Sequence, residues 1–322
     1  MIGGTSAADA GQPAWLTVRS PGFIVVFHPE HRKLAEEILA RAPMERARIA
    51  ADLGRDSNAD YEVRLADGPS DFQEAQPGGN TAPVWASGIA YPGLHVIVLQ
   101  LRSGTGRGLD EVYSTFTHEL SHMMLHGALD GRRAPRWLSE GLAMYHAGEW
   151  SFNRLAVITR AVAFKNIIPL EKLERSFPDD ARDASLAYAE SVEFVAFLLG
   201  RYGRPAMNGF IAGLAGGQDT GAALASSFGE GLGGLEEQWL SKARFKYAWL
   251  PLITSSVTLW FLISLIFLAG YARKRAESRR RLKQMEQEEL LLFDGAVDGA
   301  DDVSDETNTP GVSEQPGARK IH

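Results

Sequence analysis

Two histidines and a glutamate stand close together in the segment FTHELSHMML, which covers residues 116–125. His118 and His122 are four residues apart, so on an α-helix their side chains lie about 40° apart in rotation and about 6 Å apart along the axis. Two imidazole nitrogens can then converge on one metal ion from one face. Glu119 is rotated by about 100° from His118 and flanks the metal, where it can act as a base on an attacking water.

A catalytic zinc ion needs a third protein ligand and an open fourth position. His126 lies about 12 Å beyond His118 along the helix axis, which is too far for the two side chains to share a metal. Glu140, within PRWLSEGLAMY, is the better candidate. It is a lone carboxylate among large apolar side chains, where burial is costly and a cation would remove the cost. We therefore expect Zn²⁺ to be bound by His118, His122 and Glu140.

The elements around these residues must bring Glu140 to the two histidines. Pro135 fits the first turn of a helix, and the loop 127–134 is short, so the second helix should fold back near the first. We expect the small residues Gly141 and Ala143 to let these two helices approach closely.

The remaining pattern places strands before helices. Apolar or alternating runs predict strands at 23–27, 61–65 and 94–101, and helical periodicity predicts an amphipathic helix over 30–52. Residues 66–82 are rich in turn-forming residues and predict a loop. From 109 to 247 the chain is predicted to be helical, with breaks at 127–134, near Pro169 and Pro178, and around 200–205. This order favours an α+β fold with a small N-terminal sheet and a helical C-terminal half.

Composition excludes several classes of function. The chain has 322 residues and no cysteine, which excludes disulfides, thiolate metal ligands and a cysteine nucleophile. Its formal net charge is −7, so we expect no nucleic-acid partner.

Residues 248–270 form a run of 23 residues without a charge, long enough for one transmembrane helix. Three basic residues, Lys242, Arg244 and Lys246, lie just before this run, and seven basic residues lie in the stretch 271–283 after it. The positive-inside rule then places the C-terminal tail in the cytoplasm and the preceding domain outside it, which is the periplasm if the source is a bacterium. The start of the chain shows no signal peptide, so this orientation expects an upstream signal that the sequence does not include. The other possibility is that the domain faces the cytoplasm.

The pair HELSH and WLSEGLA resembles the gluzincins, and most closely the peptidase MA-like metallohydrolases. The resemblance covers about 20–245 and implies a zincin-type fold with zinc held by His118, His122 and Glu140. It also implies that the strand before the zinc helix, 94–101, lies at the sheet edge and pairs with extended substrate. The predicted organisation is a lead-in (1–20), a zincin-like metallopeptidase domain (21–247), a transmembrane helix (248–270) and a basic, then acidic and disordered tail (271–322).

An oxyanion donor is also needed in zinc hydrolases. Tyr188 is our choice, because SLAYAESVEFVAFLL resembles the family's later helix, which carries a tyrosine at this position. Tyr188 also lies on an apolar helical face, so a core tyrosine is the alternative, and Tyr145 and His146 are competing donors. The zinc aminopeptidases carry a G-x-M-E-N segment that this sequence lacks, which favours endopeptidase over exopeptidase action.

The leading hypothesis is thus a membrane-anchored zinc metallopeptidase acting on peptide or protein substrates, with Glu119 as the base and the lipid bilayer as a partner. Two alternatives stay open. The first is a membrane interaction protein that keeps a structural zinc, against which the presence of Glu119 counts. The second is a hydrolase of non-peptide amides, which only a substrate screen would separate from a peptidase.

Overall fold

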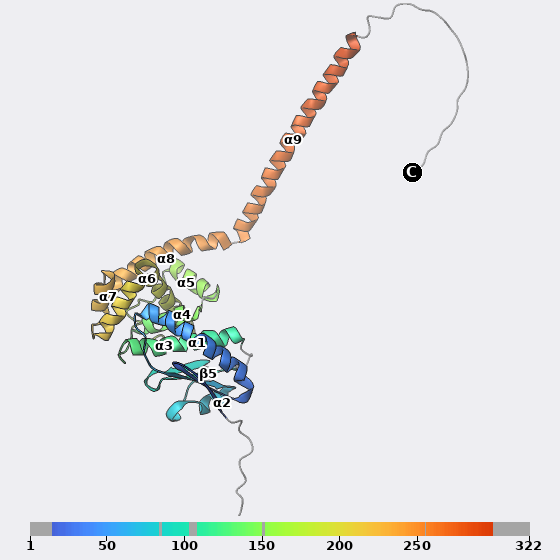
Figure 1. The fold of residues 1–322 in the computed structure, drawn as a ribbon. Coiled ribbons are helices and arrows are strands. Elements are labelled where there is room, and N and C mark those ends of the chain that lie inside the picture. Colours follow the sequence, from blue (N-terminus) through green and yellow to red (C-terminus); the bar gives the residue numbers. More distant parts are fainter. Residues whose placement is uncertain (1–14, 84–85, 103–107, 150–151, 255, 299–322) are drawn as a thin grey trace, which may run out of the picture. The chain divides into compact units, whose positions relative to one another are not determined.

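The computed structural model describes residues 15–83, 86–102, 108–149, 152–254 and 256–298. The chain divides into two compact units, Met1–Pro251 and Leu252–His322, which we describe separately. The first unit combines a sheet with a helical half, which confirms the predicted α+β class (Figure 1).

A five-stranded mixed sheet forms the N-terminal part of the first unit. Its strands follow the order β1-β2-β3-β5-β4. The three inner strands are parallel, whereas β1 and β4 run antiparallel to their neighbours. Inner parallel strands are covered on both faces and therefore read as apolar runs, as FIVVF and VIVLQ do here. The strands are β1 (Leu16–Ser20), β2 (Phe23–Phe27), β3 (Tyr61–Ala66), β4 (Gly88–Tyr91) and β5 (Val96–Gln100).

Two helices pack on one face of the sheet and a short helix packs on the other. On the first face, α1 (Arg32–Leu53) and α3 (Leu109–Ala128) share one apolar core with the strands. On the second face, α2 (Pro69–Glu74) contributes Phe72 to a smaller cluster that includes Val98. The face with the larger apolar core thus supports α3, the helix with the two histidines.

Three elements differ from the sequence expectations. Strand β1 falls in the predicted lead-in, and α2 falls in the predicted loop 66–82. Strand β4 was not predicted at all, and it takes the edge position expected for residues 94–101. Residues 96–100 instead form β5, an inner strand paired on both sides. The expectation that 94–101 would be the edge strand is therefore wrong.

The helical half begins with α4 (Arg136–Ala147), which packs against α3 and against the long helix α6 (Ala181–Ala215). Helix α6 is interrupted at Gly203, whose φ of 78° and following Pro205 end the regular hydrogen-bonding pattern as predicted. At the centre, the buried Trp137 ring stacks on Phe210. The other helices here are α5 (Phe152–Phe164), α7 (Thr220–Phe228) and α8 (Leu232–Thr254).

Gly141 allows a close helix contact, but not the one expected. A Cβ atom at this position would lie 2.5 Å from the Ser191 carbonyl oxygen and 2.7 Å from Val195 Cγ2, both on α6. The sequence expectation placed this close approach between α4 and α3. The structure shows that Gly141 holds α4 against α6, while Glu140 next to it faces α3.

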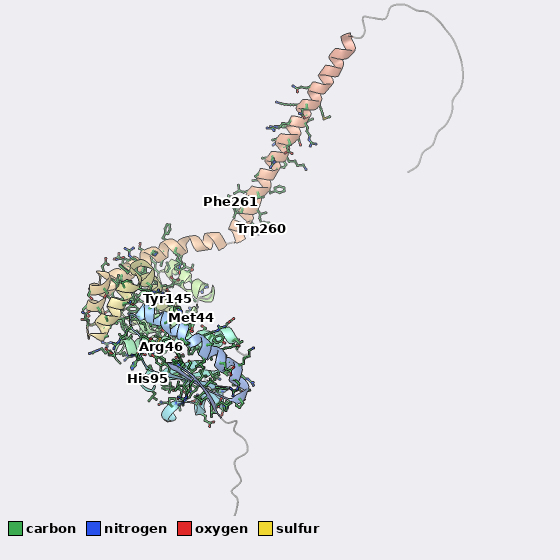
Figure 2. The ribbon with its side chains drawn as sticks, in the orientation of Figure 1. Met44, Arg46, His95, Tyr145, Trp260 and Phe261 are labelled. Carbon is green, nitrogen blue, oxygen red and sulfur yellow. The ribbon has the colours of Figure 1, made fainter. Side chains whose placement is uncertain are left out.

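The second unit contains α9 (Ser256–Asp298). The predicted membrane segment 248–270 includes residue 255, which lies outside the described part of the chain. Among the described residues, no helix combines the length and the apolar character that crossing a membrane requires. Trp260 and Phe261 are 67% and 62% exposed and project from α9 (Figure 2). The tail was predicted to be disordered from residue 284, but it is helical as far as Asp298, and residues 299–322 lie outside the described chain.

Candidate metal and catalytic site

Helix α3 holds the first two candidate ligands on one face. Acidic residues in its first turn and His126 in its last turn complement the helix dipole. Its apolar residues are buried against the sheet, which fixes the rotation of the helix. His118 and His122 then point the same way, with ring centroids 4.9 Å apart. Glu119 lies beside them and is 9% exposed.

Helix α4 brings the third candidate ligand to this face. Asp130 and Gly131 both have positive φ angles, 51° and 79°, and reverse the chain after α3. Pro135 precedes the first residue of α4, where its missing N–H leaves no donor unsatisfied. Glu140 is therefore carried back to the two histidines, as the short loop predicted.

The three side chains converge. Glu140 Oε2 lies 3.8 Å from His118 Nε2 and 3.8 Å from His122 Nε2. One nitrogen or oxygen from each of the three residues lies within 4.8 Å of the others. Among the described residues, this is the one group of three or more such side chains close enough to hold a metal ion.

Two further residues orient the imidazole rings. Glu149 Oε1 lies 3.0 Å from His118 Nδ1, and Ser139 Oγ lies 2.9 Å from His122 Nδ1. An ionised carboxylate can only accept, so Nδ1 of His118 donates to Glu149 and its Nε2 keeps the lone pair that a metal requires. The sequence analysis did not identify either partner. Ser139 stands directly before Glu140 in the WLSEGLA segment, so that motif was the signal that could have identified it, whereas Glu149 lies outside both quoted motifs, just after α4 ends.

Burial shifts the pKa values of the carboxyl groups of the site. It raises the pKa of Glu119 to about 7, and the nearby charges of Glu140 and Glu149 add to this increase. Burial likewise raises the pKa of Glu140. A glutamate with a pKa near 7 can both accept and release a proton at neutral pH, which a general base and acid requires. A cation held by the three ligands would lower the pKa of both groups again.

The pKa values of the two histidines are shifted in opposite directions. Burial and the nearby charge of His118 lower the pKa of His122 to about 3, so its imidazole is neutral at pH 7. Burial also acts to lower the pKa of His118, but the hydrogen bond that its Nδ1 donates to Glu149 and the charges of Glu119 and Glu149 outweigh it and raise the pKa. A metal ion must therefore compete with a proton at His118 more than at His122.

The edge strand β4 lies directly over Glu119. A Cβ atom on Gly88 would lie 2.6 Å from Thr115 Cγ2 and 3.1 Å from Glu119 Cγ, so only glycine allows the strand to come this close. The backbone N–H of Ala90 donates to the Glu119 carboxylate. The proposed base is thus held against the strand edge, where an extended peptide could pair.

Tyr188, on α6, lies near the third ligand. Its hydroxyl interacts with the guanidinium of Arg136, and burial together with the charge of Glu140 raises its pKa. Its ring packs edge-on against Phe177, with centroids 4.9 Å apart. Tyr188 therefore has its ring against the core and its hydroxyl beside the site, and its role as oxyanion donor stays a prediction. The structure also adds Arg136, which the sequence analysis did not consider, 3.5 Å from Glu140 Oε1.

The competing residues lie elsewhere. His146 is 3% exposed and bonds through Nδ1 to Ser121 Oγ at 2.8 Å, with Asp52 Oδ2 3.4 Å from its Nε2. It joins α1, α3 and α4 inside the core. The ring of Tyr145 packs against the same core. His126 lines the site cavity but is not in the group of three candidate ligands.

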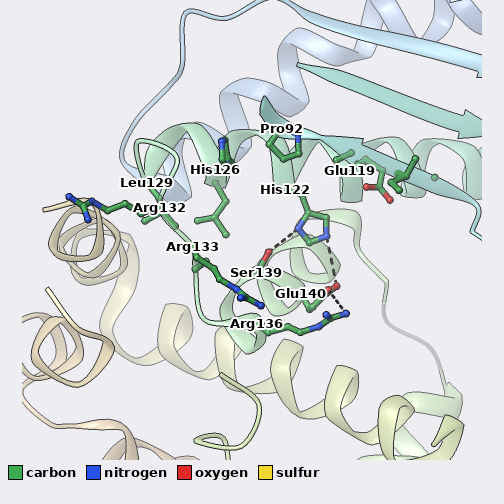
Figure 3. Close-up of a pocket in the computed structure, with 15 residues that line it drawn as sticks. Pro92, Glu119, His122, His126, Leu129, Arg132, Arg133, Arg136, Ser139 and Glu140 are labelled. Carbon is green, nitrogen blue, oxygen red and sulfur yellow. Dashed lines mark hydrogen bonds and ion pairs between the residues drawn. The ribbon is translucent and has the colours of Figure 1, made fainter. Parts of the chain in front are cut away.

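A cavity of about 430 Å³ opens beside His122, Glu140 and Glu119 (Figure 3). Strand β4 and the residues after it form one wall, and the C-terminal half of α3 forms another. The loop after α3 and the first turns of α4 close the remaining side. The cavity lies at the end of α3 that carries His122, so a ligand there would lie next to Glu119 and Glu140.

The chain was compared with known proteins. A family model described as Peptidase MA superfamily matches residues 42–244. The matched range includes α3, α4, strands β3 to β5 and Tyr188, so it contains the whole candidate site. No curated protein matches the chain.

Proposed function

The chain belongs to the peptidase MA superfamily, and on that premise we propose that it is a membrane-anchored zinc metallopeptidase that cleaves peptide bonds within protein chains. The observation that carries the proposal is the convergence of two imidazole nitrogens and one carboxylate beside a buried glutamate. A site that only held structural zinc would need no Glu119.

The donor set suits zinc. Ligand atoms bound at about 2.1 Å in a tetrahedron lie about 3.4 Å apart. The two distances from Glu140 Oε2 to the histidine Nε2 atoms are 3.8 Å, so a small side-chain movement would bring them to that value. Nitrogen and carboxylate donors without cysteine are typical of catalytic rather than structural zinc. We therefore assign His118, His122 and Glu140 as the ligands.

A zinc ion in this position would supply Lewis acidity, lowering the pKa of water and polarising the scissile carbonyl. Glu119 accepts a proton from the attacking water and then delivers it to the nitrogen of the leaving amine. Tyr188 remains protonated at neutral pH, because its pKa is raised, and donates to the oxyanion that forms at the carbonyl. Arg136 holds the tyrosine hydroxyl in place.

Strand β4 supports action within a chain. It pairs with β5 on one side, and no described strand pairs with its other side. An extended substrate can add to such an edge through main-chain hydrogen bonds, which give affinity without requiring a chain end. The sequence also lacks the aminopeptidase segment that would hold a free amine. We therefore propose endopeptidase action.

Membrane anchoring rests on the segment 248–270. In the described part of α9, large apolar residues from Trp260 to Leu268 are exposed and occur at nearly consecutive positions, so they cover all sides of the helix. Such a surface is costly in water and is stabilised by lipid. With seven basic residues after the segment and three before it, we propose a cytoplasmic tail and an extracytoplasmic catalytic domain.

Proteolysis of intact cells expressing the full chain tests this orientation. Digestion of the catalytic domain by added protease, with the tail protected, is the expected result. Protection of the catalytic domain until the membrane is permeabilised would show the opposite orientation.

The peptidase proposal is tested with the zinc-loaded full chain and an unstructured protein substrate. Glu119→Gln should keep one zinc per chain and lose about 10²–10⁴-fold in hydrolysis, because the base is removed and the ligands remain. Glu111→Gln, an exposed change in the first turn of the same helix, is the matched control and should act like wild type.

Three results would contradict the proposal. Wild-type cleavage by Glu119→Gln would show that this residue is not the base. Full zinc occupancy in a His118→Ala, His122→Ala double variant would show that the metal lies elsewhere. Zinc binding by the wild type without cleavage of any peptide would favour the interaction protein.

A further inference from the structure

The cavity beside the proposed zinc site has one strongly basic side. Arg132, Arg133 and Arg136 fall within a stretch of five residues, 132–136, after α3, and all three line the cavity. Figure 3 shows Arg132 at the end of the cavity away from Glu140, with Arg133 between it and Arg136 in this view. We call Arg132 and Arg133 the arginine pair, because Arg136 also contacts the catalytic groups.

In the part of the chain that the structure describes, the hydrogen-bond partners of the arginine pair are main-chain carbonyl oxygens. Arg132 Nε donates to the Ala215 carbonyl oxygen at 3.0 Å, and an Nη of Arg133 donates to the Arg175 carbonyl oxygen at 3.1 Å. Among the described residues, no carboxylate forms an ion pair with either guanidinium. A guanidinium carries five N–H donors, so each retains several donors for a ligand.

The local charge is unexpected in an acidic protein. The chain carries a formal net charge of −7, yet both members of the arginine pair line the cavity without an ion pair to a described carboxylate. Asp130 is the acidic residue of the same loop, and its carboxylate pairs with Arg55 at 2.8 Å, while the charge of Arg132 lowers its pKa further without forming an ion pair. The acidic groups of the cavity itself, Glu119 and Glu140, belong to the proposed catalytic site.

The distance between the catalytic groups and the arginine side of the cavity determines which substrate residue the arginine pair can bind. His126 and Leu129 line the cavity one and two turns beyond His122, which is about 6–10 Å along the helix axis. An extended peptide advances about 3.3 Å per residue. A substrate lying along β4 would therefore bring the second or third residue from the scissile bond alongside His126 and Leu129, and the arginine pair follows Leu129 in the same cavity wall.

We propose that the arginine pair selects substrates that carry a carboxylate two or three residues from the scissile bond. The planar guanidinium matches a carboxylate and can bind it through two parallel hydrogen bonds. The carboxylate can belong to an Asp or Glu side chain or to the C-terminus of the substrate. This inference rests on the proposed peptidase function and specifies its substrate class.

Binding is measured separately from cleavage, with the zinc-loaded Glu119→Gln chain and fluorescent peptides. One peptide series moves a single Glu, or Gln in its place, through the positions on both sides of the scissile bond. A second series compares free and amidated C-termini. The test variant is Arg132→Gln, Arg133→Gln, and the control Arg19→Gln, Arg182→Gln changes two exposed arginines elsewhere by the same charge.

The preferred peptide should bind about 3- to 10-fold more tightly with its carboxylate than without it, as expected for two exposed charge pairs. The test variant should lose this ratio and the control should keep it. If a Glu peptide binds more tightly than its Gln counterpart, the recognised carboxylate is an acidic side chain. If a free C-terminus binds more tightly than an amidated one, the recognised carboxylate is the C-terminus. Raising the ionic strength should reduce the ratio, because exposed charges are screened.

Two further variants separate recognition from folding. Arg132→Lys, Arg133→Lys keeps the charge and should retain part of the ratio. Arg132→Glu, Arg133→Glu should reverse it in favour of a Lys-containing peptide. Equal binding and cleavage of all peptides, with hydrolysis still dependent on Glu119, would overturn this inference alone. If no peptide is bound or cleaved, the proposed peptidase function fails and the inference fails with it.

Discussion

Replacing Glu149 by glutamine tests whether the second carboxylate of the site prepares His118 for zinc. Its Oε1 lies 3.0 Å from His118 Nδ1, and the side chain is 24% exposed. A charge-assisted hydrogen bond contributes about 1.5–3 kcal/mol. Removing a partner of a zinc-bound histidine typically weakens metal binding by 10–100-fold, which is about 1.4–2.7 kcal/mol. Partial exposure favours the lower part of this range, so we expect a loss of about 10–30-fold.

Zinc affinity is measured by competition with a chromophoric chelator at pH 7.5. Ser139→Ala removes the partner of His122 in the same way, but its hydrogen bond is between neutral groups. Such a bond contributes about 1 kcal/mol, so we expect a loss of about 5-fold. Glu36→Gln changes a carboxylate on α1 that pairs with Arg32 at 3.6 Å, far from α3 in sequence, and should not alter the affinity.

The order of these effects follows from the structure. An affinity of Glu149→Gln within twofold of wild type would refute the reasoning, since the carboxylate would then not support His118. A larger loss in Ser139→Ala than in Glu149→Gln would also refute it. Thermal unfolding of the metal-free variants shows whether a change in affinity reflects the site or the fold.

Three other predictions concern activity and stability. Tyr188→Phe should lower kcat by about 10²-fold if the hydroxyl donates to the oxyanion, and an unchanged kcat with a lower Tm would show a core role instead. Glu190 is buried, and its pKa is raised to about 8 mainly by burial. Because this pKa is higher in the folded than in the unfolded chain, protonated Glu190 contributes fully to the free energy of unfolding below pH 4.5. That contribution is lost as the pH rises from 4.5 towards 8. Glu190→Gln should reduce the loss of unfolding free energy between pH 5 and pH 8 by about 3 kcal/mol, and denaturant unfolding at both pH values measures it. Gly141→Ala should destabilise the domain by about 1–3 kcal/mol, because the added methyl group would lie 2.5 Å from the Ser191 carbonyl oxygen; an unchanged urea midpoint would contradict this.

Local periodicity was enough to predict the parts of the fold that depend on neighbouring residues. The strands at 23–27 and 61–65, the first long helix and the break at Gly203 all agree with the structure. Strands β1 and β4 were missed because their residues carry little apolar pattern. Each is an edge strand whose side chains are only partly buried or exposed, so its sequence does not need the apolar pattern of an inner strand.

The candidate site also combines features that the local sequence predicted with features that it did not. By itself, the sequence determined that His118 and His122 share a helical face, because four residues on an α-helix always bring two side chains together. It also singled out Glu140, since an unpaired carboxylate among apolar residues is costly. These are consequences of helix geometry and solvation, which act over a few residues.

Only the tertiary structure decided which groups surround those three residues. Glu149 reaches His118 from 31 residues away, and β4 covers Glu119 because the order of the strands places it, rather than β5, at the sheet edge. The arginine pair faces the cavity because the chain reverses after α3. Contacts of this kind depend on the path of the whole chain, and no local pattern of residue types specifies that path.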